Sequence, residues 1–200
     1  MRRRLLAVLM VLMGAAALLL CVPLADAYAR GRTEHLLLQR RSEAVRFADL
    51  AERMRTAADR AELSAEIGRY AELYGAGVVV VDTAGETIAR AGAGPAYRAA
   101  TDAATGTVAR TDTGEAGADT GSSPESPSTA AEARSRALTG RSTDRLPTLR
   151  PWGPGTVVLA EPVGRDERVS GAVLLAVPTG AARRDVTVRW SLIAAGAVAA

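Results

Sequence analysis

The chain has 200 residues, room for about one domain, and its 25 basic and 22 acidic side chains give a formal net charge of +3. Every basic residue is an arginine, and the absence of lysine excludes a phosphate-binding loop ending in Gly-Lys-Ser/Thr and any Schiff-base lysine. With one histidine, His35, and one cysteine, Cys21, the chain can form neither a His/Cys zinc site nor an internal disulfide. Three positive charges lie at Arg2 to Arg4, so no basic stripe indicates a nucleic-acid partner.

The first 25 residues have the pattern of a membrane segment. The twenty residues from Leu5 to Leu24 carry no charge, and as a helix they would span about 30 Å, the thickness of a bilayer core. The basic residues 1–4 precede this stretch, and the positive-inside rule places them in the cytoplasm. We therefore expect transmembrane helix 1 at residues 5–25, in contact with membrane lipid, and an extracytoplasmic location for the domain after it. A cleaved signal peptide, with its cleavage site at Ala25-Asp26-Ala27, and a lipid-anchored Cys21 are the alternatives.

Two helices are expected next. A long juxtamembrane helix should run from about Ala27 to Ala57, because this stretch lacks proline and is rich in Ala, Leu, Arg and Glu. A second helix should start at Asp59, where Glu62 stands three residues on as in a capping box, and end at Gly75. Its apolar residues recur on one helical face: Leu63, Ile67, Tyr70 and Tyr74.

Two β-hairpins are expected in the rest of the chain. The first covers residues 78–91 and begins with a run of four valines, and Asp82 and Gly85 supply the chemistry of its turn. The second covers residues 156–177. With helices before and between them, these hairpins predict a small antiparallel α+β domain within residues 26–185.

A polar stretch separates the two hairpins. Residues 106–129 contain one large apolar side chain, Val108, and too little apolar area to offset the entropy of ordering. We expect this stretch to be a disordered insertion. A short helix should follow at Ala130–Leu138 and close at Gly140.

The C-terminal residues 186–200 are expected to begin a second transmembrane helix. The chain is apolar from Trp190 onward, but eleven residues are too few to cross about 30 Å of hydrocarbon. On this interpretation the helix is truncated, and the chain is the front part of a longer protein. A buried amphipathic helix at the C-terminus is the alternative.

No residue is assigned a catalytic, cofactor-binding or metal-binding role. His35 is the one side chain suited to act as a base near neutral pH, but it lies in a helical stretch without a partner constellation. Glu161 and Asp166 are isolated carboxylates, and we assign them no acid–base role. We expect no active site within these 200 residues.

Three aromatic residues are candidates for ligand contact. Tyr70 and Tyr74 have helical spacing beside other apolar residues, which favours a place in the core over a ligand pocket. The segment Arg150-Pro151-Trp152 offers a cation and an aromatic face, although a loop tryptophan more often covers one end of a small core. Neither group is assigned a binding role.

Four segments carry a resemblance to a known family. They are ELYGAGVVVVDTAGETIARAG at 72–92, ARSRALTGR at 133–141, LPTLRPWG at 146–153 and EPVGRDERVSGAVLLAVPT at 161–179. With the basic N-terminus and two apolar ends, the chain resembles the input half of actinobacterial two-component sensor histidine kinases. The resemblance implies a PAS-like or Cache-like sensor domain and a homodimer. It implies ATP, Mg²⁺ and a response regulator only for domains outside this segment, because no phosphoacceptor box occurs and His35 lies in the wrong context.

The expected function derives from this resemblance. The chain would detect an unknown extracytoplasmic ligand at the cell membrane and transmit the signal through two membrane helices. The input domain of a non-kinase receptor and a membrane-anchored binding protein of the cell envelope are the alternatives. The residues after Ala200 would discriminate between them, because a phosphoacceptor box there indicates a kinase.

Overall fold

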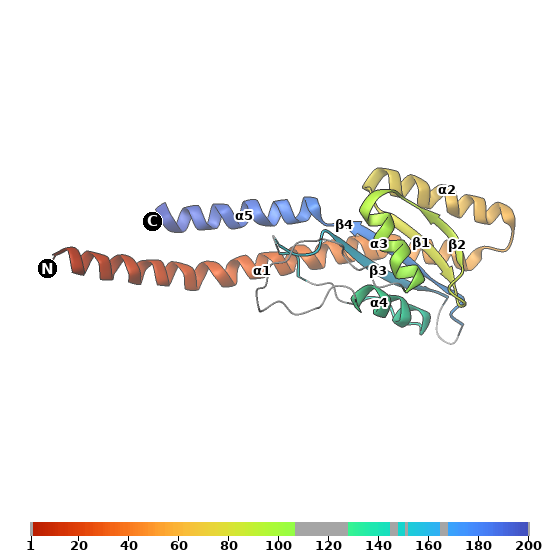
Figure 1. Ribbon diagram of the computed structural model, residues 1–200, viewed down its shortest axis with the longest axis horizontal. Helices are drawn as coiled ribbons and strands as arrows, with labels where there is room; N and C mark the ends of the chain where they lie inside the picture. Colours follow the sequence, from red (N-terminus) through yellow and green to blue (C-terminus); the bar gives the residue numbers. More distant parts are fainter. Residues whose placement is uncertain (1, 107–127, 145–147, 151, 165–167, 200) are drawn as a thin grey trace, which may run out of the picture. The chain divides into compact units, whose positions relative to one another are not determined.

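A computed structural model describes residues 2–106, 128–144, 148–150, 152–164 and 168–199. These residues form five helices and a four-stranded antiparallel sheet, an α+β arrangement (Figure 1). In chain order the elements are α1 (Arg2–Arg53), α2 (Ala57–Tyr74), β1 (Gly77–Asp82), β2 (Thr87–Ala91), α3 (Gly94–Thr105), α4 (Ser128–Leu138), β3 (Thr156–Val163), β4 (Gly171–Pro178) and α5 (Gly180–Ala199).

The chain divides into two compact units. The first comprises residues 1–36, 147–153 and 179–200, and the second comprises residues 37–146 and 154–178. The sheet and the helices α2, α3 and α4 belong to the second unit, together with the C-terminal part of α1.

The sheet has the strand order β2-β1-β4-β3. Both expected hairpins are present, and they are joined by the pairing of β1 with β4, in which Val78 lies opposite Leu175. The first turn has the expected chemistry, because Asp82 Oδ1 accepts a hydrogen bond from the Glu86 amide at 2.8 Å and Gly85 has a φ of 85°. The hairpin prediction is therefore confirmed.

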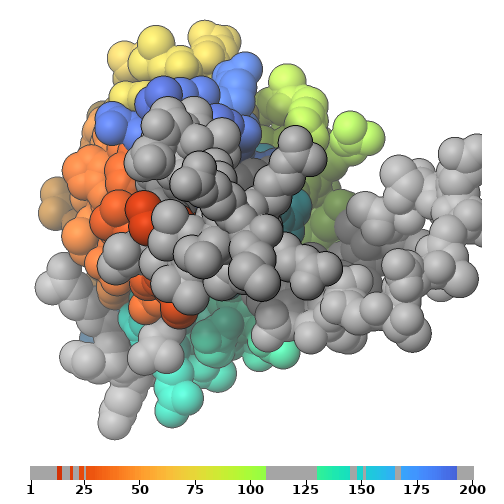
Figure 2. Space-filling model, turned by 90° about the vertical axis from the view of Figure 1, so that its left-hand side faces the viewer, coloured from red at the N-terminus to blue at the C-terminus, as the bar shows by residue number. Residues whose placement is uncertain are grey.

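Helices cover both faces of this sheet. In β1, Val78 and Val80 pack toward α1 and α2, whereas Val79 and Val81 pack toward α3 and α4. In Figure 2 the yellow residues of α2 accordingly lie at the top of the view and the teal residues of α4 at the bottom. A strand that is buried on both faces needs apolar residues at every position, and this explains the run of four valines.

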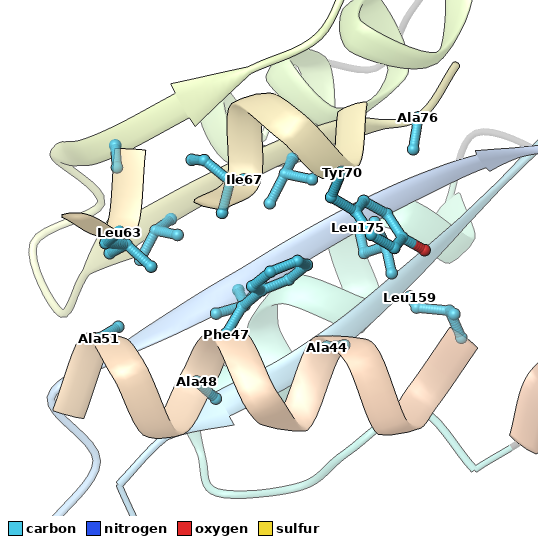
Figure 3. Close-up of a cluster of buried hydrophobic side chains, with 14 of the residues drawn as sticks. Ala44, Phe47, Ala48, Ala51, Leu63, Ile67, Tyr70, Ala76, Leu159 and Leu175 are labelled. Carbon is cyan, nitrogen blue, oxygen red and sulfur yellow. The ribbon is translucent and has the colours of Figure 1, made fainter. Parts of the chain in front are cut away.

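One face of the sheet, which we call the large-residue face, packs against α1 and α2. Figure 3 shows Phe47 of α1 between that helix and α2, which contributes Leu63, Ile67 and Tyr70. The rings of Phe47 and Tyr70 meet edge to face, with their centroids 5.2 Å apart. Bulky apolar side chains therefore fill the space on this face.

The other face, which we call the alanine face, packs against α3 and α4. The buried residues of these two helices are Ala96, Ala100, Ala103, Ala104, Ala133 and Ala137. Small side chains let α3 come close to the sheet, so that a Cβ placed on Gly77 of β1 would collide with the backbone of Ala96. Helix α3 was not predicted, because a stretch of alanines gives no contrast between large apolar and polar positions.

The start of α2 corrects one expectation. The helix begins at Ala57, and its N-cap is Thr56, whose Oγ1 accepts a hydrogen bond from the Asp59 amide at 3.2 Å. Asp59 Oδ2 in turn accepts a hydrogen bond from the Thr56 amide at 2.8 Å. Asp59 is therefore the partner in the capping box and not the cap itself. The helix ends at Gly75 as expected, but Tyr74 is 46% exposed rather than buried.

The predicted helix after the insertion is also present. It is α4, and Gly140 follows it in the left-handed conformation with a φ of 80°. Most of the expected insertion, residues 107–127, lies outside the described residues, as does Asp166 in the second turn.

A loop and a proline protect the outer edge of β3. The Thr143 amide donates to the Ala160 carbonyl at 3.0 Å, and the Ala160 amide donates to Thr143 Oγ1 at 3.0 Å. In a strand, backbone amides two residues apart point to the same side. The amide at position 162 would therefore face outward like that of Ala160, but Pro162 has no N–H group to leave unpaired. The segment after α4 is thus fixed along this edge.

The first unit contains the N-terminal part of α1, residues 147–153 and α5. Within it, the Tyr28 hydroxyl donates to Asp185 Oδ2 at 3.0 Å, and the Leu149 amide donates to the buried Thr33 hydroxyl at 2.9 Å. The rings of Trp152 and Trp190 meet edge to face at 5.5 Å.

The expected transmembrane helices are corrected by the structure. Among the described residues, no helix is both long enough and apolar enough to cross a membrane. The stretch at 5–25 is not a separate helix but the beginning of α1, which continues to Arg53 through a strongly charged sequence. The helix expected from residue 186 begins at Gly180, and its first half contains four charged residues: Arg183, Arg184, Asp185 and Arg189.

Candidate functional site

The residues singled out from the sequence do not form one site. His35 is exposed on α1, and Trp152, at 67% exposure, packs against Trp190. Arg150 lies 3.9 Å from Asp26 in an ion pair. These residues all belong to the first unit, whereas the remaining described candidates, Tyr70, Tyr74 and Glu161, belong to the second.

Tyr70 and Tyr74 contact the same arginine. The Arg40 guanidinium lies 4.4 Å from the centroid of the Tyr74 ring, and its Nη1 donates to the Tyr70 hydroxyl at 3.0 Å. Burial raises the pKa of Tyr70, and the neighbouring Arg40 opposes that shift. Because the Tyr70 ring is part of the core on the large-residue face, we interpret this group as structural.

Glu161 is the unexpected feature of the second unit. It lies on β3 between Leu159 and Val163, and side chains two residues apart share a face of the sheet. A carboxylate therefore occupies a position on the large-residue face, and the residue is only 8% exposed. The Ser142 hydroxyl, in the loop along the edge of β3, donates to Glu161 Oε1 at 2.7 Å.

The second oxygen of this carboxylate has a distant partner. Arg41 Nε lies 3.9 Å from Glu161 Oε2, and Arg41 Nη1 lies 3.7 Å from Asp144 Oδ1. Burial raises the pKa of Glu161, the Ser142 hydrogen bond and the Arg41 charge lower it, and the Asp144 charge adds to the increase. The effect of burial is the largest, so the charged form of Glu161 is poorly compensated in this structure.

Beside Glu161 there is a cavity of about 280 Å³. Its lining comes from α1, from the loop after α4 and from the end of β3, and consists of Val45, Ala48, Asp49, Glu52, Gly140, Ser142, Glu161, Pro162 and Gly164. Three of these residues are carboxylates, one is a hydroxyl and none is basic. We call this space the Glu161 cavity.

The lining of the Glu161 cavity combines polar and apolar groups. Within the described residues, no group of three or more His, Cys, Asp or Glu is placed to hold a metal ion. The lining provides hydrogen-bond acceptors, one hydroxyl and apolar surface, a combination that small-molecule sites use to fix and orient a ligand.

Comparison with known proteins assigns no family. No family model matches the chain, and no curated protein matches it. The expected assignment to the two-component kinases therefore has no family evidence behind it.

Sequence reasoning set Glu161 aside because no second carboxylate lies close to it in the chain. Its partners come from α1 and from the loop after α4, and only the fold brings them together. One signal was available in the sequence. Positions 157, 159 and 163 of β3 share a face with position 161 and are all apolar, so a glutamate at 161 is out of pattern and marks either edge protection or a site.

Proposed function

We propose that the second unit is a ligand-sensing domain in which a small molecule occupies the Glu161 cavity and acts on α1. The observation that carries this proposal is that α1 lines the cavity with Val45, Ala48, Asp49 and Glu52 and also brings Arg41 to Glu161. A ligand that changes these contacts acts directly on a helix of 52 residues, and a continuous helix is suited to carry such a change along its length.

The biological setting is part of the same proposal. The resemblance of segments 72–92, 133–141, 146–153 and 161–179 to sensor regions supports a sensory role and a homodimer. Residues 1–24, with three arginines followed by uncharged residues, support a location outside the cytoplasm for the sensing domain. The volume of the cavity supports a ligand at the small end of the usual range.

The proposal is tested by filling the cavity. Val45 is half-buried on α1 and lines the cavity, so Val45→Phe should occupy part of the space, whereas Leu38→Phe adds a ring at an exposed position of the same helix. A panel of small amines, carboxylates and sugars is screened against the full chain by thermal shift. We expect a compound that stabilises the wild type and Leu38→Phe, fails to stabilise Val45→Phe, and slows amide hydrogen exchange in residues 41–52. A compound that stabilises all three proteins equally would show that the cavity is not its site.

A further inference from the structure

The Glu161 cavity is unbalanced in charge, and this points to a class of ligand. Its described lining includes Asp49, Glu52 and Glu161 and no basic residue. Two of these carboxylates come from successive turns of α1, and the third is buried on β3. Glu52 is exposed and Asp49 half-buried, so an anion in this space would meet repulsion from carboxylates on α1 and on β3, whereas a cation would meet attraction.

Glu161 also has an incomplete set of partners. The Ser142 hydroxyl satisfies Oε1 at 2.7 Å, but among the described residues the cation that approaches Oε2 is Arg41, whose Nε lies 3.9 Å away. Charge-assisted hydrogen bonds between nitrogen and a carboxylate are typically about 2.7–2.9 Å long, so Arg41 is too far away to make one. A buried carboxylate thus has room for a donor that the described part of the chain does not supply to Oε2 at bonding distance.

Arg41 is held loosely enough to be displaced. It is shared between Glu161 and Asp144, with distances of 3.9 and 3.7 Å, and its side chain is 38% exposed. The Asp144 side chain is 79% exposed, and ion pairs at such exposed positions add little to stability. The free energy needed to move the Arg41 guanidinium into solvent is therefore small.

We propose that the ligand of the Glu161 cavity is a small organic cation with a guanidinium or primary ammonium group, and that it competes with Arg41 for Glu161. This inference rests on the proposed function and specifies its ligand and its coupling. The ligand's cationic group donates a hydrogen bond to Glu161 Oε2 and displaces the Arg41 side chain. Because Arg41 belongs to α1, binding directly changes the contacts of that helix. Arg41 thus competes with the ligand for Glu161 and weakens ligand binding, so a higher ligand concentration is needed to displace it.

The test is calorimetric titration of the full chain with agmatine, which has both cationic groups, and with glutarate as an anionic probe. Four proteins are compared: the wild type, Glu161→Gln, Arg41→Gln and Arg46→Gln. The last is the matched control, because Arg46 is on the same helix but pairs with Glu43 and Glu66. Thermal unfolding of each variant shows that it is folded.

Opposite effects of the two cavity variants are expected. Glu161→Gln should weaken agmatine binding about tenfold or more, the scale of a hydrogen bond to a charged group. Arg41→Gln should tighten it about threefold, the scale of an exposed ion pair, and Arg46→Gln should leave it unchanged. A structural role for Arg41 predicts unchanged or weaker binding in Arg41→Gln, and that result would overturn the inference.

The titrations distinguish a failure of the cation inference from a failure of the proposed function. If neither the wild type nor Arg41→Gln binds agmatine, but glutarate binds and Val45→Phe abolishes its binding, the cavity is a ligand site and the cation inference is wrong. If agmatine binds equally to Val45→Phe and the wild type, it binds outside the cavity, and the cation inference fails. The proposed function itself fails only if no compound of the panel distinguishes Val45→Phe from the wild type.

Discussion

The two faces of the sheet are packed in different ways. On the large-residue face, Phe47, Leu63, Ile67 and Leu175 are each at most 1% exposed and fill the space between the sheet and two helices. On the alanine face, α3 and α4 contribute buried alanines, and the larger side chains, such as Leu174, come from the strands.

This difference shows two ways to bury the same sheet. Large side chains keep helices at a distance and stabilise by the apolar area that they remove from water. Alanines remove less area but let the helix backbone come close, as α3 does at Gly77. The first arrangement tolerates a gap, and the Glu161 cavity opens on that face, whereas the close approach of α3 on the second face makes added atoms costly.

The largest expected effect comes from deleting a ring on the large-residue face. Phe47→Ala should lower the free energy of unfolding by about 3–5 kcal/mol, because it removes buried area and leaves a cavity. Urea denaturation measures the change. Leu38→Ala is the control, since Leu38 is 68% exposed on the same helix and should change stability by less than about 0.5 kcal/mol. Equal effects of the two variants would show that α1 does not form this core.

The alanine face should respond to the opposite change. Ala100→Leu should destabilise by about 1–3 kcal/mol, because α3 lies too close to the sheet to admit three more carbon atoms. Ala99 is half-buried on the same helix, so Ala99→Leu should cost less. Stabilisation by Ala100→Leu in the same denaturation experiment would mean that this face also has free volume.

A smaller effect is expected at the start of α2. Thr56→Ala should cost about 1 kcal/mol through loss of the N-cap hydrogen bond, without changing the packing of either face. Thr56→Ser retains the hydroxyl and should be close to neutral. Loss of stability comparable to that of Phe47→Ala would indicate that the cap controls the docking of α2 and not only its first turn.

The smallest effect is expected at Glu161, and it depends on pH. Burial raises the pKa of Glu161 in the folded state, so the folded chain holds this proton over a pH interval in which the unfolded chain has lost it. Stability therefore falls as the pH rises from the unfolded pKa to the folded pKa. Glu161→Gln should remove this loss and be more stabilising, relative to the wild type, at about pH 7 than at about pH 4. A stability difference that does not change with pH would show that the pKa of Glu161 is the same in the folded and unfolded states.

Much of the second unit was predictable because its signals are local. The hairpin turn depends on Asp82 and Gly85 within four residues, and the end of α2 depends on Gly75. Local signals also misled where two candidate caps were close in sequence. Asp59 is a good cap by residue type, but Thr56 begins the helix and uses Asp59 as its partner.

The candidate site could not be predicted because its parts lie far apart in the chain. About a hundred residues separate Arg41 from Ser142, and nineteen separate Ser142 from Glu161. No sequence pattern links these three positions. The expectation of membrane-spanning helices failed for a related reason. It rested on short windows, whereas in the structure the apolar stretches are the ends of the longer helices α1 and α5.

The sequence by itself determined the two hairpins, the first turn at Asp82 and Gly85, and the end of α2 at Gly75, because each depends on neighbours along the chain. Only the tertiary structure decided that β1 pairs with β4, that alanine helices cover one face, and that a carboxylate is buried beside a cavity. These features depend on the distance between elements, and that distance is set by the side chains of both partners at once.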